Sequence, residues 1–181
     1  MDTSERASYP APAITFITKA PGGFFVGFLI WLEATPLADW VRMSTIGYPL
    51  MITLHAIGMA VMVGIALMLD ARLLGRFAGI PYQSLQRFLG IAWLGLGINT
   101  ISGSCLFAAQ ATQYIVDPVY MTKMGLVLLG AITAAILQTT LGRDAAGWGQ
   151  SRPPVNVRIV AVLSIVFWVT AIIMGRLTAY L

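Results

Sequence analysis

The only histidine of this chain, His55, is the residue whose chemistry best suits a metal or a haem. It lies within the apolar segment 48–75, and the first charged residue after it is Asp70. An ionisable side chain inside a membrane-length apolar segment marks either a functional site or a polar contact between helices. Two interpretations of His55 therefore stay open. Its ring N–H finds a partner such as Asn99 or a backbone carbonyl, or its imidazole binds a ligand.

The first ligand to consider is a b-type haem, because imidazole is a common axial ligand of haem iron. Haem propionates need cations, and Lys123 and Arg176 lie at the ends of two predicted spans, on the same side as His55. The predicted cofactor-binding residues are therefore His55, Lys123 and Arg176, with His55 as the metal ligand. A sixth ligand would be a methionine such as Met124 or Met174, a residue of a neighbouring subunit, or absent.

The second ligand to consider is copper, because Met51, His55 and Met59 follow one another at four-residue steps. Thioethers around an imidazole suit Cu(I), and Cys105 is a further soft donor, although methionines in apolar helices also simply fill gaps. One cysteine and one histidine exclude cysteine-rich zinc and iron–sulfur frameworks. No catalytic triad motif or phosphate-binding glycine loop is present, so we do not expect an enzyme on its own.

The composition indicates an integral membrane protein. Of 181 residues, 58% are hydrophobic and only 10% are charged, and the mean hydropathy is +0.82. Soluble domains carry about 25% charged residues, so a chain this poor in charge needs lipid to cover much of its surface. The net charge of +4 comes from few residues and is better interpreted as a topology signal than as a nucleic-acid site.

The hydropathy pattern predicts an all-α fold, a four-helix transmembrane bundle preceded by a short interfacial amphipathic helix segment. The segment 24–32 is apolar but too short to cross a bilayer, and Trp31 and Trp40 flank it as interfacial anchors; a full span is the alternative. The predicted parts are an irregular tail over 1–21, one transmembrane domain over 22–181, an interfacial helix over about 24–42, and spans over about 45–69, 88–115, 119–141 and 159–181.

The basic residues predict the orientation. The loops after the first and third spans hold six arginines, namely Arg72, Arg76, Arg87, Arg143, Arg152 and Arg158. The positive-inside rule places both loops in the cytoplasm and both termini outside. For a bacterial inner membrane, both termini are then periplasmic. The N-terminus lacks a basic region followed by an apolar core, so it does not read as a secretory signal.

Helical spacing predicts which faces point into the bundle. The expected inward residues are Met51, His55, Gly58 and Met62; Gly95, Asn99, Gly103, Leu106 and Gln110; Lys123, Gly130, Ala134 and Gln138; and Ala161, Ser164, Trp168, Ala171 and Gly175. Gly58 and Gly103 would also let a flat macrocycle approach. Polar residues within the spans, namely Asn99, Ser102, Ser104 and Gln138, are expected to form hydrogen bonds between helices.

The first predicted span also resembles a family of small bacterial inner-membrane proteins. The shared pattern is a histidine, then glycines, then Asp-x-Arg-Leu-Leu-Gly, and here it falls on His55, Gly58, Gly64 and residues 70–75. Further matches are ISGSCLF at 101–107, the lysine of YMTKMGL and the ending GRLTAY at 175–180. The resemblance covers about 31–181 and implies no particular activity. A weaker similarity links the chain to copper-resistance membrane domains and small b-type cytochromes, which also carry histidine on apolar helices.

Two classes of function follow. One is a membrane electron-transfer or cofactor-binding subunit that uses His55. The other is an accessory subunit without chemistry, held in a membrane complex by its apolar faces, with copper handling as an outside alternative. Minimal loops leave little room for a site in water, so either class implies partner subunits or a homo-oligomer in the bilayer.

Overall fold

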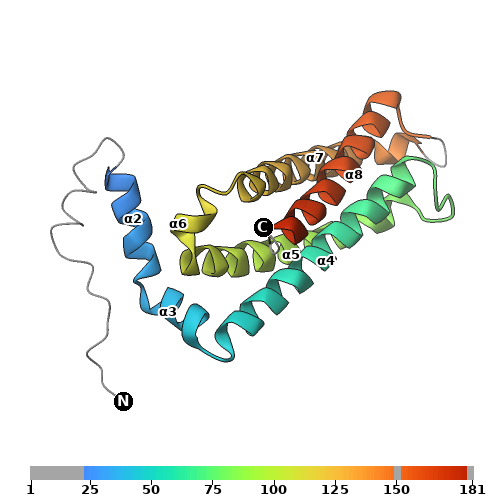
Figure 1. Cartoon of the computed structure of the whole chain (residues 1–181). Helices are drawn as coiled ribbons and strands as arrows, with labels where there is room; N and C mark the ends of the chain where they lie inside the picture. Colours follow the sequence, from blue (N-terminus) through green and yellow to red (C-terminus); the bar gives the residue numbers. More distant parts are fainter. Residues whose placement is uncertain (1–22, 149–151, 179–181) are drawn as a thin grey trace, which may run out of the picture.

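The fold is entirely helical over the part of the chain that a computed structural model describes, residues 23–148 and 152–178 (Figure 1). The predicted all-α class is therefore confirmed, and the predicted tail over 1–21 lies outside the described residues. The helices are α2 (Gly23–Glu33), α3 (Pro36–Met43), α4 (Gly47–Leu73), α5 (Tyr82–Ala109), α6 (Ala111–Tyr114), α7 (Pro118–Trp148) and α8 (Val155–Leu177).

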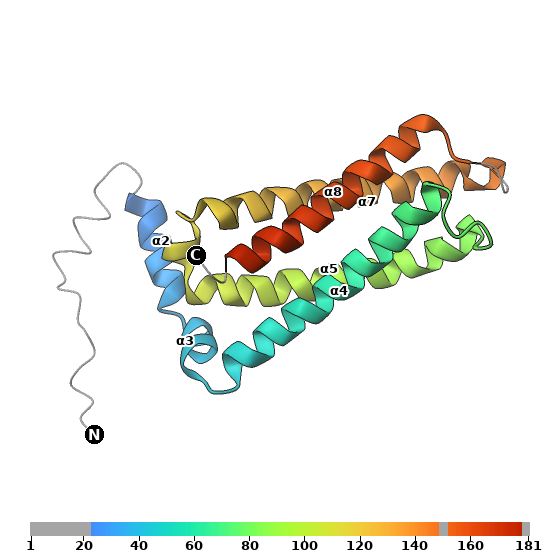
Figure 2. The same ribbon diagram turned by 45° about the vertical axis from the view of Figure 1, so that its right-hand side comes forward.

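The four long helices form two antiparallel hairpins, α4 with α5 and α7 with α8 (Figures 1 and 2). The hairpins contact each other mainly through α4 and α8, with a smaller contact between α5 and α7. Each long helix contains a segment long and apolar enough to cross a membrane, namely Gly47–Leu73, Ser84–Ala109, Pro118–Ala145 and Val155–Leu177. The chain is an integral membrane protein, and lipid surrounds its apolar outer faces.

The two ends of the bundle differ, and we name them separately. The cap end is where α4 and α7 begin and α5 and α8 end, with α2, α3 and α6 lying beside it (Figure 2). The arginine end is the opposite end, where the α4–α5 and α7–α8 loops and their arginines lie.

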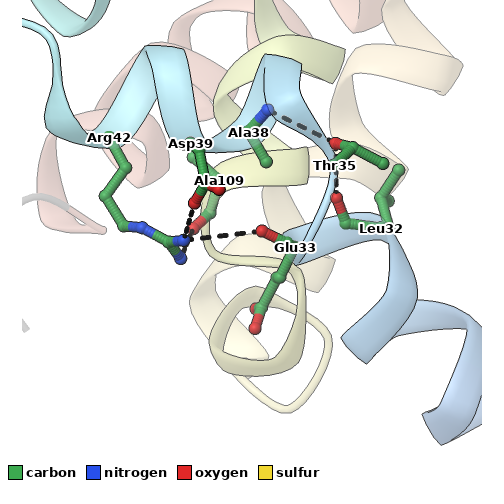
Figure 3. A network of polar contacts seen from close by, with 7 residues as sticks. All are labelled: Leu32, Glu33, Thr35, Ala38, Asp39, Arg42 and Ala109. Atoms are coloured by element: carbon green, nitrogen blue, oxygen red, sulfur yellow. Dashed lines mark hydrogen bonds and ion pairs between the residues drawn. The ribbon is translucent and has the colours of Figure 1, made fainter. Parts of the chain in front are cut away.

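The predicted interfacial helix over 24–42 consists of two helices, α2 and α3, with a bend of 57° between them. Thr35 causes the break, because its hydroxyl donates to the Leu32 carbonyl at 2.7 Å and accepts from the Ala38 amide at 3.3 Å (Figure 3). Pro36 then starts α3, where a proline is tolerated. Only α3 is amphipathic, whereas α2 is apolar on all sides.

The second predicted span, over 88–115, is wrong at both ends, because α5 covers Tyr82–Ala109. The backbone of Gln110 leaves the helical region, with φ −147° and ψ 41°, and α6 starts a new turn. Tertiary contacts hold this break. The Glu33 carboxylate accepts from the Thr112 amide at 2.7 Å and from the Thr112 hydroxyl at 2.8 Å, as a capping residue would.

Arg42 holds the other side of the same break (Figure 3). Its guanidinium donates to the Ala109 carbonyl at 3.4 Å, to the Glu33 carbonyl at 3.5 Å and to the Asp39 carboxylate at 2.6 Å. Arg42 therefore satisfies a carbonyl that the last turn of α5 leaves free. The pair of short helices is thus fastened to the end of α5, on the α4–α5 side of the cap end.

The remaining helix boundaries also extend beyond the predicted spans. Helix α7 continues past residue 141 to Trp148, and α8 begins at Val155 instead of residue 159, directly after two prolines. Trp148 packs edge-on against the Tyr82 ring, with ring centroids 5.6 Å apart. These extra turns lie at the arginine end. They are less apolar than the predicted spans, and contacts such as that between Trp148 and Tyr82 stabilise them.

A leucine-rich core fills the arginine end. Its buried members come from all four long helices, and they are Leu69, Leu73, Tyr82, Leu85, Leu89, Leu137, Leu141, Ala145, Val157 and Ala161. Arg72 fixes the adjacent α4–α5 loop, because it donates to the Ile80 carbonyl at 2.7 Å and to the Tyr82 hydroxyl at 3.0 Å. Arg72 therefore secures this end of α4 to the loop that follows it.

Candidate functional site

His55 lies on α4, in the half of the bundle nearer the cap end, and faces α5. Its Nδ1 atom lies 3.0 Å from the carbonyl oxygen of Asn99. In return, the side-chain amide of Asn99 donates to the carbonyl oxygen of His55 at 2.8 Å. The two residues thus form a reciprocal pair of hydrogen bonds between α4 and α5, which we call the His55–Asn99 clasp. The predicted partner of the ring N–H, a backbone carbonyl or Asn99, is found.

The clasp determines which ring nitrogen of a neutral His55 carries the proton. A carbonyl oxygen only accepts, so Nδ1 must be the donor in the bond to Asn99. The lone pair then lies on Nε2, which makes no hydrogen bond to the described part of the chain. Histidines that ligate metals commonly have this arrangement, with one nitrogen donating to a backbone carbonyl and the other free to bind.

Two glycines make the clasp possible. A Cβ at Gly58 would lie 2.6 Å from both the backbone nitrogen of Asn99 and the carbonyl oxygen of Gly95, so α4 and α5 touch there through their main chains. A Cβ at Gly103 would lie 2.9 Å from the Cε1 atom of His55. The expectation that Gly58 and Gly103 leave room for a macrocycle is wrong, because α5 and the imidazole itself fill that space.

Of the other two predicted cofactor-binding residues, Lys123 lies near His55 and is half-buried, whereas Arg176 is exposed. The Lys123 ammonium and the His55 imidazole are close enough for their charges to interact. The Lys123 side chain extends from α7 toward α8, where its Cε atom would lie 3.4 Å from a Cβ at Gly175. Arg176 is exposed on the surface of α8, one residue beyond Gly175. His55 and Lys123 therefore form the centre of the candidate site.

Two of the predicted soft-metal donors, Met59 and Cys105, can be placed in the described structure, and the copper interpretation stays a prediction. Met59 packs against the buried residues Met62, Val63, Ala66, Ala92, Ala134 and Trp168, as a gap-filling methionine does. Cys105 is a free, half-buried thiol. Among the residues that the structure describes, no group of three or more His, Cys, Asp or Glu side chains is placed to hold a metal ion.

The predicted interhelical hydrogen bonds are only partly found. Asn99 makes one in the clasp, and Gln138 on α7 makes another by accepting from the Trp93 indole of α5. Ser102 instead donates to the Ile98 carbonyl at 2.7 Å, and Ser104 donates to the Thr100 carbonyl at 2.9 Å. Both serines thus donate within α5, because a hydroxyl reaches the carbonyl one turn earlier more easily than a neighbouring helix. The Ser102 oxygen also lies 3.5 Å from Nδ1 of His55 on α4, so its predicted interhelical contact is present.

The inward faces agree better with prediction. Helix α8 buries Ala161, Ser164, Trp168 and Ala171, all of which the helical spacing indicates. The exception is Gln110, which is exposed because α5 ends before it.

An aromatic stack at the cap end is not apparent from the sequence. The rings of Tyr114 and Tyr120 are stacked with centroids 4.8 Å apart, and Phe107 stacks on Tyr120 at 5.8 Å. Burial raises the pKa of the Tyr114 phenol above its usual value, and the nearby Tyr48 and Asp117 raise it further. Tyr114 therefore stays a neutral hydroxyl. The only sequence signal for this cluster is the gathering of aromatic residues near span ends, which membrane interfaces favour.

The chain was also compared with known proteins. No protein-family model matches it. Neither the curated proteins nor the solved structures contain a match. The geometry of the His55 site therefore carries the functional argument.

Proposed function

We propose that this chain is a membrane subunit in which Nε2 of His55 is an axial ligand to a b-type haem. The observation that carries the proposal is the 3.0 Å contact between Nδ1 of His55 and the Asn99 carbonyl. It holds the ring in one orientation and leaves the lone pair on Nε2, the protonation state that iron requires. The bound haem would supply one-electron transfer within the membrane.

The residues around His55 indicate which side chains would hold a haem. Gly58 and Gly103 are filled by α5 and by the imidazole, so they offer no flat surface to a macrocycle. Lys123 is the nearby cation that would pair with a propionate. The chain has one histidine, so the proposal includes a second ligand from a methionine or from a partner subunit of a larger membrane complex.

The same proposal includes an orientation in a bacterial inner membrane. Six arginines lie in or beside the two loops of the arginine end, which the positive-inside rule places in the cytoplasm. The cap end then faces the periplasm, with both termini on that side. The test is to replace Arg152 with cysteine and label it with a membrane-impermeant thiol reagent. We expect labelling on inverted vesicles only, and labelling on intact cells would contradict the proposed orientation.

The haem proposal is tested on the full chain purified in mild detergent. We expect a Soret band and one equivalent of iron in the wild type, and loss of both in His55→Ala. The matched control is Met59→Leu, which changes the neighbouring turn of α4 but leaves the imidazole, so the band should persist. A colourless, metal-free preparation that still assembles with a partner would contradict the proposal. Copper that is lost in Met51→Leu or Met59→Leu would favour copper handling instead.

One observation favours the second candidate, an accessory subunit without chemistry. The clasp satisfies the carbonyl of His55, the amide of Asn99 and one ring nitrogen, so it accounts for both polar residues as a helix–helix contact. If His55→Ala binds no less cofactor than the wild type but loses stability, this structural role is the correct one.

A further inference from the structure

A second buried polar site lies at the arginine end and involves Asp70 of α4. Its carboxyl group is in the last turn of the helix, yet only 1% of the residue is exposed. Neither carboxyl oxygen has a hydrogen-bond partner within the described structure. The Ser164 hydroxyl of α8 lies beside it, is also fully buried, and also has no partner within hydrogen-bond geometry. Two unsatisfied polar groups thus face each other across the α4–α8 contact.

The cations around Asp70 do not neutralise it. Arg72, on the same helix, is committed to the Ile80 carbonyl and to the Tyr82 hydroxyl of α5. Arg158 on α8 has a buried Nε atom without a partner, and no ion pair joins it to Asp70 in the described residues. The remaining arginines of this end, namely Arg76, Arg87, Arg143 and Arg152, are exposed.

The cost of this arrangement depends on the charge of Asp70. An ionised carboxylate buried without a partner is one of the most expensive groups in a protein interior or a membrane. A neutral carboxylic acid is far cheaper to bury, and it gains an O–H donor that the carboxylate lacks. That donor is what the pair needs, since a hydroxyl oxygen such as that of Ser164 accepts hydrogen bonds readily.

We propose that Asp70 and Ser164 form a proton-binding site between α4 and α8. In the folded protein, Asp70 holds a proton and donates it in a hydrogen bond to the Ser164 hydroxyl oxygen, so the hydroxyl and one of the two carboxyl oxygens gain a partner. The proton comes from water at the arginine end. The site lies about 15 residues along α4 from His55, roughly 22 Å, so it does not depend on any group bound there.

The proposal is tested by infrared spectroscopy on the full chain in lipid. We expect the wild type at neutral pH to show the C=O band of a protonated carboxylic acid, and Asp70→Asn to lose it. Ser164→Ala should keep the band but shift it, because the hydrogen bond to the hydroxyl is gone. The matched control is Asp144→Asn on α7, whose carboxylate is exposed and should contribute no such band.

The pH dependence of unfolding gives a second, independent measurement. The folded chain keeps the Asp70 proton while the unfolded chain releases it, so the folded state is favoured at low pH and loses that advantage as pH rises. Between the ordinary pKa of an unfolded aspartate, about 4, and neutral pH, the unfolding equilibrium constant of the wild type should rise with pH. This rise should be steeper than that of Asp70→Asn by up to roughly tenfold per pH unit.

Three results would overturn the proposal. One is a wild type without the acid band at neutral pH. Another is a charge exchange, Asp70→Arg with Arg158→Asp, that restores a stability lost in each single variant, because it would show an ion pair. The third is a stabilisation by Na⁺ that Asp70→Asn abolishes, which would assign the carboxylate to a cation. If Asp70→Asn fails to fold, the wild-type band and its shift in Ser164→Ala still decide the question.

Discussion

The two ends of this bundle are held together by different kinds of contact. At the arginine end, leucines from all four long helices form a buried apolar core. Toward the cap end, α4 and α5 meet through glycine main chains and the His55–Asn99 clasp, and hydrogen bonds from Glu33 and Arg42 fasten the short helices. The arginine end is thus held mainly by apolar burial, whereas the cap end is held by main-chain contact and hydrogen bonds.

Helix α4 shows the same contrast within one element. His55 has a fixed partner for one nitrogen and leaves the other free, which suits a ligand. Asp70, four turns later, has no hydrogen-bond partner for either oxygen among the described residues, which suits a bound proton. What a polar residue in a membrane helix can bind thus depends less on its type than on which of its atoms already have a hydrogen-bond partner on the neighbouring helix.

The largest effect should come from removing a side chain of the arginine-end core. Leu137 is 1% exposed, and Leu137→Ala should lower the free energy of unfolding by about 2–5 kcal/mol, because it leaves a cavity. The measurement is unfolding by SDS in mixed micelles. Leu128→Ala, on the lipid-facing side of α7 where 62% of the residue is exposed, should change it by less than about 1 kcal/mol. Equal losses in both variants would contradict the burial of Leu137 in the core of the arginine end.

A smaller but sharper effect should come from the α4–α5 contact. Gly58→Ala puts a methyl group against the backbone of α5, which cannot move away cheaply, so we expect a loss of about 1–3 kcal/mol. Gly64→Ala, less than two turns later on α4, meets nothing within 4 Å and should be neutral or slightly stabilising. The same unfolding assay compares them. A tolerated Gly58→Ala would mean that the helices are farther apart than described.

The smallest effect should come from the His55–Asn99 clasp. The informative result is whether the effects of substituting its two residues add. Each side chain bonds to the main chain of the other residue, so neither substitution removes the other's bond. His55→Leu and Asn99→Leu should each cost about 0.5–1.7 kcal/mol, and the double variant should cost their sum within about 0.5 kcal/mol. A strongly non-additive double-mutant cycle would show that the two side chains act through each other, and the clasp would need a different description.

Much of the fold follows from the sequence, because lipid imposes simple rules. A run of about 20 apolar residues must become a helix in the bilayer, and small residues at helical spacing mark where helices approach. The inward face of α8, from Ala161 to Ala171, was predictable for this reason. His55 and Lys123 were also found in this way, since ionisable residues stand out in an apolar background.

The features that sequence reasoning missed all depend on tertiary contacts. Nothing in the residues around Gln110 signals a helix break, because Glu33 and Arg42, far away in the chain, stabilise it. Helical spacing correctly placed Gly58 and Gly103 on the inward face. It could not show that α5 and the imidazole, and no macrocycle, occupy the space beside them. Asp70 lies in the last turn of α4, and its burial beside Ser164 of α8 depends on the packing of two helices that the sequence does not reveal.

The unequal lengths of the helices also determine how the chain lies in the membrane. Helix α7 has 31 residues and α8 has 23, so they span about 46 Å and about 35 Å, whereas the hydrocarbon layer is only about 30 Å thick. Two paired helices of such different length cannot both match that layer over their full length. The final turns of α7, with Arg143 and Asp144 exposed, must project into the headgroup region and the water beyond it. The extra length of α7 therefore forms a polar extension on the arginine side of the membrane, and both helices can cross a hydrocarbon layer of the same thickness.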